Sequence, residues 1–428
     1  MLFFIYDILL HVFALFYFPY MAVRLALKGR KRAGVRQRLG FIDKELSHLR
    51  KGKTVWVHAV SVGETIAAVP LVKALMERRP ELTVFFSTVT ETGQAVAKKE
   101  LPDATVFYFP FDFSYIVSRV VDRIRPDIFV VVETEIWPNL LRALNRRGVA
   151  AVMVNGRISV RSFDRYMMGR FFIRGVLELM THFHMQSQAD ADRIKDMGAP
   201  PERVSVVGNI KFDQACKALK EGGREVFTRA RLGIPEAALV FIAGSTHKGE
   251  EEEALAAYRE MLASRPDALM VVAPRHPERL QEVAGLLERE GFGYVMKSKL
   301  TGEPLTAPKV IILDTMGELA MLYRVGDVNF VGGSWANVGG HNVLEPVAFG
   351  KPVFFGPHMS NFAEIGAILK DCGVGIKVKD GKDLASEALR LIAEPERREM
   401  LGRLAKETLL RNKGALDRNL ELIERYLA

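Results

Sequence analysis

Short apolar runs alternate with helical patterns along most of this chain, and this alternation restricts its fold more than any other feature. The apolar runs predict two series of strands, at 54–58, 83–87, 105–109, 128–132, 150–154 and 204–207, and then at 239–244, 269–273, 310–313, 328–331, 352–355 and 375–378. Helical patterns lie between them, as at 65–77, 115–124 and 249–261, and the chain ends in a charged helical pattern over 395–428. Strands that alternate with helices predict parallel sheets in α/β units.

The two series of strands predict two doubly wound, Rossmann-like domains. The 428 residues also exceed what one hydrophobic core usually holds. We expect a segment 1–40 ahead of the domains, a first domain over 41–213 and a second over 214–428, with a linker at 214–223. Ligands of such sheets bind beyond the carboxyl ends of the strands, so two facing domains predict a cleft. That arrangement suits a transferase with one substrate per domain, and equally a hydrolase or a binding protein.

Residues 2–27 are almost wholly apolar and are long enough to cross a bilayer as a helix. Asp7, His11 and Arg24 interrupt the run, and a cluster of Lys and Arg follows it. A cleaved signal peptide carries its basic residues before the apolar run, and a buried core helix usually has a polar face. We therefore expect an uncleaved membrane anchor that either spans the bilayer or lies in its interface. The basic cluster places the domains that follow on the cytoplasmic side.

The charge distribution argues against a nucleic-acid-binding protein. The net charge is +9, and most of this excess lies in the first 40 residues, which hold seven Lys and Arg and one acid. The rest of the chain is nearly neutral, whereas nucleic-acid binders usually carry basic patches on the folded domain. Two cysteines, Cys216 and Cys372, cannot build a disulfide framework, which favours a reducing compartment.

Three carboxylates and one lysine are candidate site residues of the first domain. Glu64 follows the first strand at the start of a helix, where it either caps the helix or acts as a general base. Glu133 and Glu135 follow a fully apolar strand, and burying such acids is costly unless they are paired. Lys211 could meet an anionic substrate, although a solvated surface lysine is the ordinary alternative.

In the second domain, glycine and polar residues follow several strands. The turn 244–247 precedes a helix whose N-terminus could bind phosphate, and Arg275 could grip a phosphate or carboxylate. The segment 332–346 holds two pairs of glycines, which favour close approach of a ligand to the backbone. Its Asn342 and Glu345 have the spacing of a helix cap, which is the purely structural alternative.

No motif predicts a metal site. HExxH and paired CxxC motifs are absent from the sequence. Asp190 and Asp192 are spaced as in some metal-dependent transferases, but in a helix such residues do not share a face, so we expect both at the solvated surface.

Taken together, these motifs resemble those of the 3-deoxy-D-manno-octulosonic acid (Kdo) transferases of lipopolysaccharide synthesis. The likeness runs over nearly the whole chain. Besides the apolar N-terminal segment, the motifs that carry it, in family order, are His58-x-x-Ser61-Val-Gly63-Glu64, Glu133-x-Glu135-x-Trp137-Pro138-Asn139, Gly208-Asn-Ile-Lys211-Phe-Asp213, Pro274-Arg275-His276, Asp314-Thr-Met-Gly-Glu318-Leu and Gly339-Gly340-His341-Asn342-x-Leu344-Glu345.

The resemblance implies an inverting, metal-independent glycosyltransferase of the GT-B fold that uses no cofactor. Such enzymes transfer Kdo from CMP-Kdo to a lipid A precursor, lipid IVA, at the cytoplasmic face of the inner membrane. It implies Glu64 as the catalytic base, and Glu133 and Lys211 as groups that stabilise the transition state. The CMP-binding positions that it implies are Pro274, Arg275, Met316, Gly317, Glu318, Asn342, Val343, Leu344 and Glu345.

Two other functions fit the same pattern. One is a GT-B transferase or epimerase that uses a UDP-sugar. Competition between CMP and UDP would distinguish it from an enzyme that uses CMP-Kdo. The other is a membrane scaffold without catalytic activity that binds nucleotide or glycolipid, which substitution of Glu64 would separate.

Overall fold

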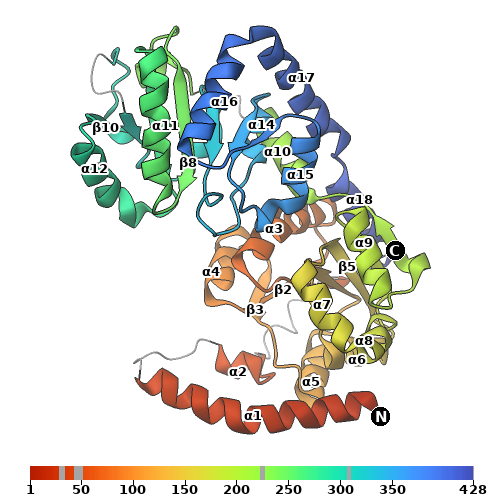
Figure 1. Ribbon diagram of the computed structural model, residues 1–428. Helices are drawn as coiled ribbons and strands as arrows, with labels where there is room; N and C mark the ends of the chain where they lie inside the picture. Colours follow the sequence, from red (N-terminus) through yellow and green to blue (C-terminus); the bar gives the residue numbers. More distant parts are fainter. Residues whose placement is uncertain (28–33, 43–51, 222–226, 306–309, 428) are drawn as a thin grey trace. The chain divides into compact units, whose positions relative to one another are not determined.

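The computed structural model describes residues 1–27, 34–42, 52–221, 227–305 and 310–427, and it divides the chain into two compact units (Figure 1). Unit 1 comprises Met1–Ile210 and Lys413–Ala428, and unit 2 comprises Lys211–Asn412. The basic residues 28–32 of the expected juxtamembrane cluster lie outside the described residues.

Unit 1 contains a parallel sheet of seven strands in the order β3-β2-β1-β4-β5-β6-β7. Its strands are β1 (Thr54–His58), β2 (Thr83–Thr88), β3 (Thr105–Tyr108), β4 (Ile128–Val132), β5 (Ala150–Gly156), β6 (His182–Met185) and β7 (Val204–Val206). The strands predicted in this half are thus confirmed, and β6 is an addition. Because β1 lies between β2 and β4, the direction in which strands are added reverses between β1 and β4.

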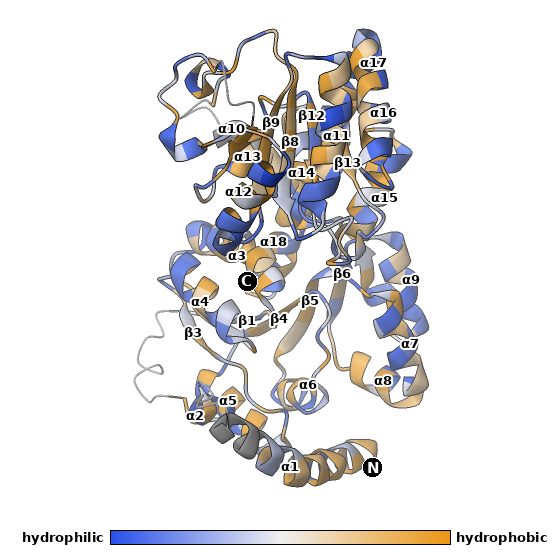
Figure 2. Cartoon of the chain, turned by 60° about the vertical axis from the view of Figure 1, so that its left-hand side comes forward, coloured by the Kyte–Doolittle hydropathy of each residue, from blue (hydrophilic) through white to orange (hydrophobic). Residues whose placement is uncertain are grey.

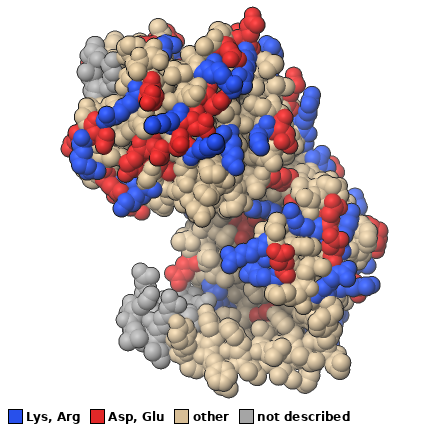
Figure 3. Space-filling model, in the orientation of Figure 1, with Lys and Arg blue, Asp and Glu red and all other residues tan. Residues whose placement is uncertain are grey.

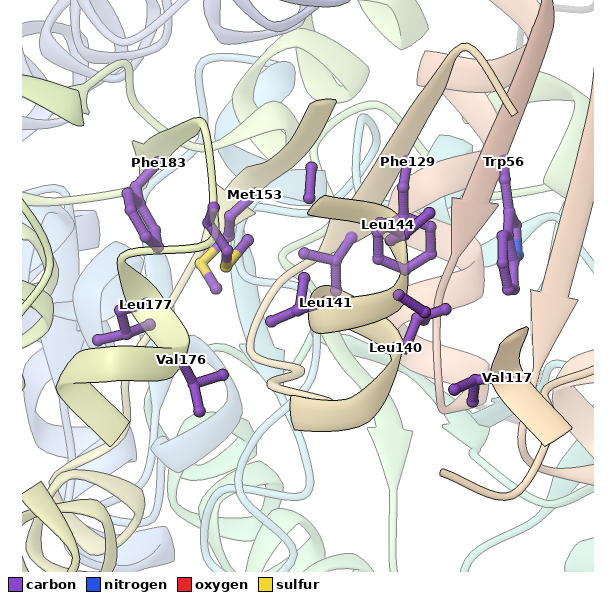
Figure 4. Packing of buried hydrophobic residues seen from close by; sticks show 14 of the residues in the cluster. Trp56, Val117, Phe129, Leu140, Leu141, Leu144, Met153, Val176, Leu177 and Phe183 are labelled. Atoms are coloured by element: carbon purple, nitrogen blue, oxygen red, sulfur yellow. The ribbon is translucent and has the colours of Figure 1, made fainter. Parts of the chain in front are cut away.

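Both faces of this sheet are covered. Successive β1 residues belong to two different cores: Trp56 packs against Phe129 in one of them, whereas Val55 and Val57 belong to the core that also holds residues of α3 and α18. Figure 4 shows the first core, in which Leu140, Leu141 and Leu144 of α6 lie against the strands. Burial on both faces explains why the strands are continuous apolar runs.

Four helices of unit 1, α3, α4, α7 and α9, begin at side-chain caps. Ser61, Thr90, Ser159 and Ser187 each accept a hydrogen bond from the backbone amide three residues further on. The helices are α1 (Leu2–Leu27), α2 (Val35–Arg38), α3 (Val62–Arg78), α4 (Glu91–Glu100), α5 (Ser114–Ile124), α6 (Pro138–Asn145), α7 (Val160–Met168), α8 (Arg170–Leu177), α9 (Gln188–Asp196) and α18 (Ala415–Arg425).

Unit 2 repeats the architecture with a second parallel sheet of seven strands, in the order β10-β11-β9-β8-β12-β13-β14. Its strands are β8 (Val240–Thr246), β9 (Leu269–Pro274), β10 (Tyr294–Met296), β11 (Val310–Ile312), β12 (Val328–Val331), β13 (Val353–Phe355) and β14 (Gly375–Lys377). Its helices of four residues or more are α10 (Ile210–Glu221), α11 (Glu250–Ser264), α12 (Leu280–Arg289), α13 (Leu319–Leu322), α14 (Leu344–Ala348), α15 (Ala363–Asp371), α16 (Gly381–Ala393) and α17 (Pro395–Arg411). Two doubly wound α/β units confirm the predicted fold class.

The structure differs from the expected domain boundaries in two places. Residues 214–221 of the expected linker continue helix α10, while 222 and 223 lie outside the described residues. The last helix, α18, belongs to unit 1 rather than to the second domain, because Leu420 and Ile423 pack in the core that also holds Val72 and Leu75 of α3.

The N-terminal segment forms one helix, α1, as predicted. Its stretch 2–20 is the helix among the described residues that is long and apolar enough to cross a membrane. Two of its polar side chains bind the rest of unit 1: Asp7 accepts hydrogen bonds from Ser114 and Asn139, and Tyr6 donates one to Asp112.

Candidate active site

The candidate site of unit 1 lies at the carboxyl ends of β1 and β4, where the order of the strands reverses. His58 at the end of β1 is paired in register with Val131 near the end of β4, so the loops that follow these strands are neighbours. The first loop leads to Glu64 and the second carries Glu133 and Glu135. Ligands of doubly wound sheets bind at this kind of position.

Glu64 both caps helix α3 and belongs to this cluster of carboxylates. Its two carboxylate oxygens accept hydrogen bonds from the amide of Val60 at 2.7 Å and the hydroxyl of Ser61 at 2.9 Å. Its own amide donates to the Ser61 hydroxyl, which completes a capping box. The structure therefore realises the structural alternative, and the same hydrogen bonds fix the orientation of a half-buried carboxylate.

Two carboxyl groups of this cluster, Glu64 and Glu135, have raised pKa values. Partial burial raises the pKa of Glu64, and the negative charge of Glu133 raises it further against the lowering effect of its hydrogen bonds. Burial, followed by the charges of Glu64 and Glu133, raises the pKa of Glu135 to about 8. Raised pKa values of carboxylates at a strand edge are typical of acid–base sites. Glu135, a candidate site residue to which the family resemblance assigned no role, therefore belongs to this cluster together with Glu64 and Glu133.

The backbone at Glu133 is strained. Its φ angle of 62° is left-handed, a conformation that costs free energy for any residue with a Cβ atom. The Glu133 amide donates to the Val154 carbonyl of β5 at 3.1 Å, which holds the turn in place. Such strain persists where the surroundings fix it, and it often marks functional loops.

In unit 2, the corresponding strand ends form a cavity of about 110 Å³ beside Arg275. It brings together four of the predicted CMP-binding residues, Pro274, Arg275, Met316 and Gly317. Glu318 adjoins them, and its carboxylate is bound by Lys297 at 2.8 Å and by the hydroxyl of Thr315. The cavity therefore combines a guanidinium with the turn that follows β11.

The predicted residues 342–345 divide into two groups. Asn342 donates a hydrogen bond from Nδ2 to the Glu345 carboxylate at 3.2 Å, and burial raises the pKa of Glu345 to about 7 even though the charge of Arg275 lowers it. Val343 and Leu344 are fully buried in the core of unit 2, so only their backbone can meet a ligand. Asn342 is not the N-cap of α14, which begins at Leu344, but it still accepts the Leu344 amide.

The first pair of glycines serves internal packing, which corrects our interpretation of it as a place for a ligand. A Cβ atom on Gly332 would lie 2.7 Å from the carboxylate of Glu250. That buried carboxylate accepts hydrogen bonds from the amides of Gly333, Ser334, Trp335 and Ala336. The N-terminus of α11, which we expected to favour phosphate, thus carries its own acids.

A histidine pair beside Arg275 was missed by the sequence reasoning. Nε2 of His247 lies 2.8 Å from Nε2 of His341, and the two rings are stacked within 4° of parallel. Burial, followed by the neighbouring His247, lowers the pKa of His341 to about 4, so the pair shares one hydrogen bond between neutral rings. Both histidines stand in motifs that we singled out, but nothing in the sequence showed that segments 94 residues apart meet.

Lys211 lies at the start of α10 with Nζ 4.3 Å from the centre of the Phe362 ring, so it is more than the solvated lysine of the alternative. Asp190 is buried, not solvated as expected, because it accepts hydrogen bonds from the Ile158 amide and the Ser187 hydroxyl, whereas Asp192 is exposed. Among the described residues no group of three or more His, Cys, Asp or Glu side chains is arranged to hold a metal ion.

Comparisons with known proteins point to one family. The family model described as 3-deoxy-D-manno-octulosonic-acid transferase matches residues 33–214. The 3-deoxy-D-manno-octulosonic acid transferase of Haemophilus influenzae is 36% identical over 93% of this chain and 92% of its own length. The Bordetella pertussis protein of the same name is 34% identical over 87% of both chains.

Solved structures show the same fold at low sequence identity. A glycosyltransferase of Rickettsia africae superposes with a TM-score of 0.56 at 13% identity, covering 88% of this chain and 99% of its own. A UDP-GlcNAc 2-epimerase of Neisseria meningitidis gives a TM-score of 0.56 at 15% identity, covering 84% of this chain and 100% of its own. Both likenesses concern the fold alone.

Proposed function

The chain belongs to the family of 3-deoxy-D-manno-octulosonic acid (Kdo) transferases of lipopolysaccharide biosynthesis, and from that premise we propose that it transfers Kdo from CMP-Kdo to a lipid A precursor. As a glycosyltransferase it joins an activated sugar to an acceptor hydroxyl. The proposed reaction inverts the configuration at the anomeric carbon, takes place at the cytoplasmic face of the inner membrane and uses lipid IVA as acceptor.

The observation that carries the proposal is the carboxylate cluster at the carboxyl ends of β1 and β4. Glu64 is the proposed general base: it takes the proton from the acceptor hydroxyl while that oxygen forms a bond to the anomeric carbon. A base needs a pKa near the working pH, and the raised pKa of Glu64 moves it in that direction. The hydrogen bonds from Val60 and Ser61 hold its carboxylate in one orientation. Glu133 would stabilise the positive charge that develops on the sugar.

The leaving group takes the electron pair of the broken bond as CMP. Arg275, in the cavity with Met316 and Gly317, is the proposed partner of the phosphate, because a guanidinium binds phosphate through two parallel hydrogen bonds. Lys211 would add a second positive charge. With these cations, the proposed mechanism needs no metal ion. Asn342 and Glu345 hold the turn beside Arg275 and are the proposed contacts to the rest of the nucleotide.

The apolar helix α1 supports a membrane-bound acceptor. Its outer side chains are exposed, with Leu15 70% and Phe16 71% accessible, and exposed apolar surface of this extent marks an interaction site. The Lys and Arg residues that follow α1 favour attachment to the cytoplasmic leaflet. A protein attached there meets both a soluble nucleotide sugar and a glycolipid.

The test is sugar transfer by the purified full chain, with products identified by mass. We expect Glu64→Ala to lose a factor of about 10² to 10⁴ in transfer rate and to keep its binding of CMP. Glu77→Ala, an exposed position on the same helix, is the control and keeps the parent rate. Transfer by the Glu64 variant at the parent rate would exclude this residue as the base.

Nucleotide competition separates the proposal from a UDP-sugar enzyme of the same fold. CMP should inhibit transfer and UDP should not, because the proposed donor carries a cytidine monophosphate. Inhibition by UDP alone would assign the chain to the other donor class.

A further inference from the structure

A groove lined by three arginines lies between α2 and α5 of unit 1. It has a volume of about 850 Å³ and is lined by Arg36, Gly40, Phe41, Ile42, Tyr115, Ser118, Arg119, Asp122 and Arg123. Asp122 is the acid among these residues, and Arg147 binds both of its oxygens, at 2.7 and 2.9 Å. The positive charges of the groove are therefore not neutralised by its own acid.

The surroundings of the arginine side chains favour binding of an anion. Nε and Nη2 of Arg123 are shielded from solvent and have no hydrogen-bond partner within the part of the chain that the structure describes. The guanidinium carbon of Arg119 lies over the Phe41 ring, 5.1 Å from its centre, which is a cation–π contact. Arg36 and Arg119 line the groove and are exposed, so a phosphate group there can accept charge-assisted hydrogen bonds from them, and the charge of Arg123 beside them adds to the attraction.

The groove adjoins the helix α1. Tyr115, on its wall, lies 6.0 Å from the His11 ring of α1, and Asp7 binds Ser114 at the start of α5. Phe41 and Tyr115 are 53% and 55% exposed, so the groove offers aromatic rings as well as cations. Arginine beside aromatic side chains is typical of surfaces that rest in the headgroup layer of a membrane.

The packing of α1 shows how a bilayer would reach this groove. Its partly covered residues follow a helical stripe, Phe3, Tyr6, Asp7, Leu10, Ala14, Tyr17 and Phe18. This stripe rests on the rest of unit 1: the Phe18 ring contacts the Phe111 ring, with centres 5.2 Å apart, and beside the stripe His11 meets Phe113 edge to face at 4.8 Å. Figure 1 shows α1 lying along unit 1 below α5, and Figure 2 shows its apolar character.

A helix that is docked on its own unit over residues 3–18 cannot also carry that stretch across the bilayer away from unit 1. The face that α1 turns outward is free of Lys, Arg, Asp and Glu in Figure 3, so it can enter the apolar layer of one leaflet. The groove would then lie at the depth of the headgroups.

We propose that the groove between α2 and α5 binds the phosphate group of a bilayer lipid while α1 lies in the plane of the same leaflet. The two contacts have different roles: α1 supplies apolar attachment, and the arginines recognise phosphate. This inference concerns a site other than the carboxylate cluster, so its test measures membrane binding and not sugar transfer.

The experiment is flotation of the full chain with three kinds of vesicle: neutral phosphatidylcholine, phosphatidylcholine with phosphatidic acid, and phosphatidylcholine with an equal charge supplied by a fatty acid carboxylate. We expect the parent to bind the phosphatidic acid vesicles tightest. The double variant Arg119→Gln and Arg123→Gln should lose affinity for them on the order of thirtyfold. Its binding to neutral vesicles should be unchanged, which also shows that it is folded.

The matched control is the double variant Arg289→Gln and Arg403→Gln, which removes the same charge from exposed positions of unit 2. It should bind all three kinds of vesicle as the parent does. The proposal is overturned if the control loses as much affinity as the groove variant, if the groove variant loses none, or if the parent does not distinguish phosphate from carboxylate.

Discussion

Neutralising Glu135 should stabilise unit 1, by an amount that depends on pH. Its pKa is about 8 in the folded protein against an ordinary value of 4.5, because burial and the charges of Glu64 and Glu133 disfavour the carboxylate. Between these two pH values the folded state holds a proton that the unfolded state has released. The free energy of unfolding of the parent therefore falls as pH rises through this window.

The magnitude follows from the size of the shift. Each pKa unit corresponds to about 1.4 kcal/mol, so the shift sets an upper limit of about 5 kcal/mol at pH 8. Glu135→Gln, which is neutral throughout, should gain about 2 to 5 kcal/mol over the parent at pH 8. Well below pH 4.5, where both states of the parent are protonated, the gain should vanish.

Denaturant unfolding followed by tryptophan fluorescence measures this difference. Trp56 and Trp137, two of the three tryptophans, lie in unit 1, so the signal reports mainly on that unit. Glu77→Gln, exposed on α3, makes the same change of charge and serves as the control. A gain of equal size at both ends of the pH range, or no gain at pH 8, would refute the electrostatic origin of the shift.

Three further predictions test packing that the structure shows. Glu250→Gln should destabilise unit 2 by about 3 kcal/mol, because a single amide oxygen cannot accept hydrogen bonds from all the backbone amides that the carboxylate binds. The thermal midpoint should fall accordingly, and an unchanged midpoint would contradict this. Gly244→Ala would place a Cβ atom 1.9 Å from the Tyr323 hydroxyl and should lower the midpoint, with partial recovery when Tyr323→Phe is added; no recovery would place the strain elsewhere. Asp7→Asn should weaken the docking of α1, because Asp7 accepts hydrogen bonds from Ser114 and Asn139. Limited proteolysis would detect this as faster cleavage ahead of α5, and cleavage at the parent rate would show that the apolar stripe alone holds the helix.

The long elements were predictable because each buried strand is a continuous apolar run, whereas the apolar residues of the helices recur with the period of a helix. The short strands β6 and β10 escaped prediction, since His182–Met185 mixes histidine with apolar residues and Tyr294–Met296 has only three residues. The segment 214–221 looked like a linker because it is rich in Lys and Ala, yet it continues a helix.

For the candidate site, the strand ends correctly indicated where the carboxylates and Arg275 would lie. The sequence could not indicate contacts between distant segments. Glu250 binds backbone amides 83 to 86 residues away. From the sequence alone, the glycines that make room for this carboxylate were therefore interpreted as glycines that let a ligand approach the backbone. The raised pKa of Glu135 depends in the same way on which side chains the folded loops bring near it.

The chain enters unit 2 at Lys211 and returns to unit 1 at Lys413, so the unit that is begun first is completed last. The core between α3 and β5 lacks Leu420 and Ile423, and His184 lacks its partner Asn419, until α18 has been synthesised. A nascent chain that stalls before α18 would leave this apolar surface open to chaperones and proteases, although the loops that carry the carboxylate cluster had already been made.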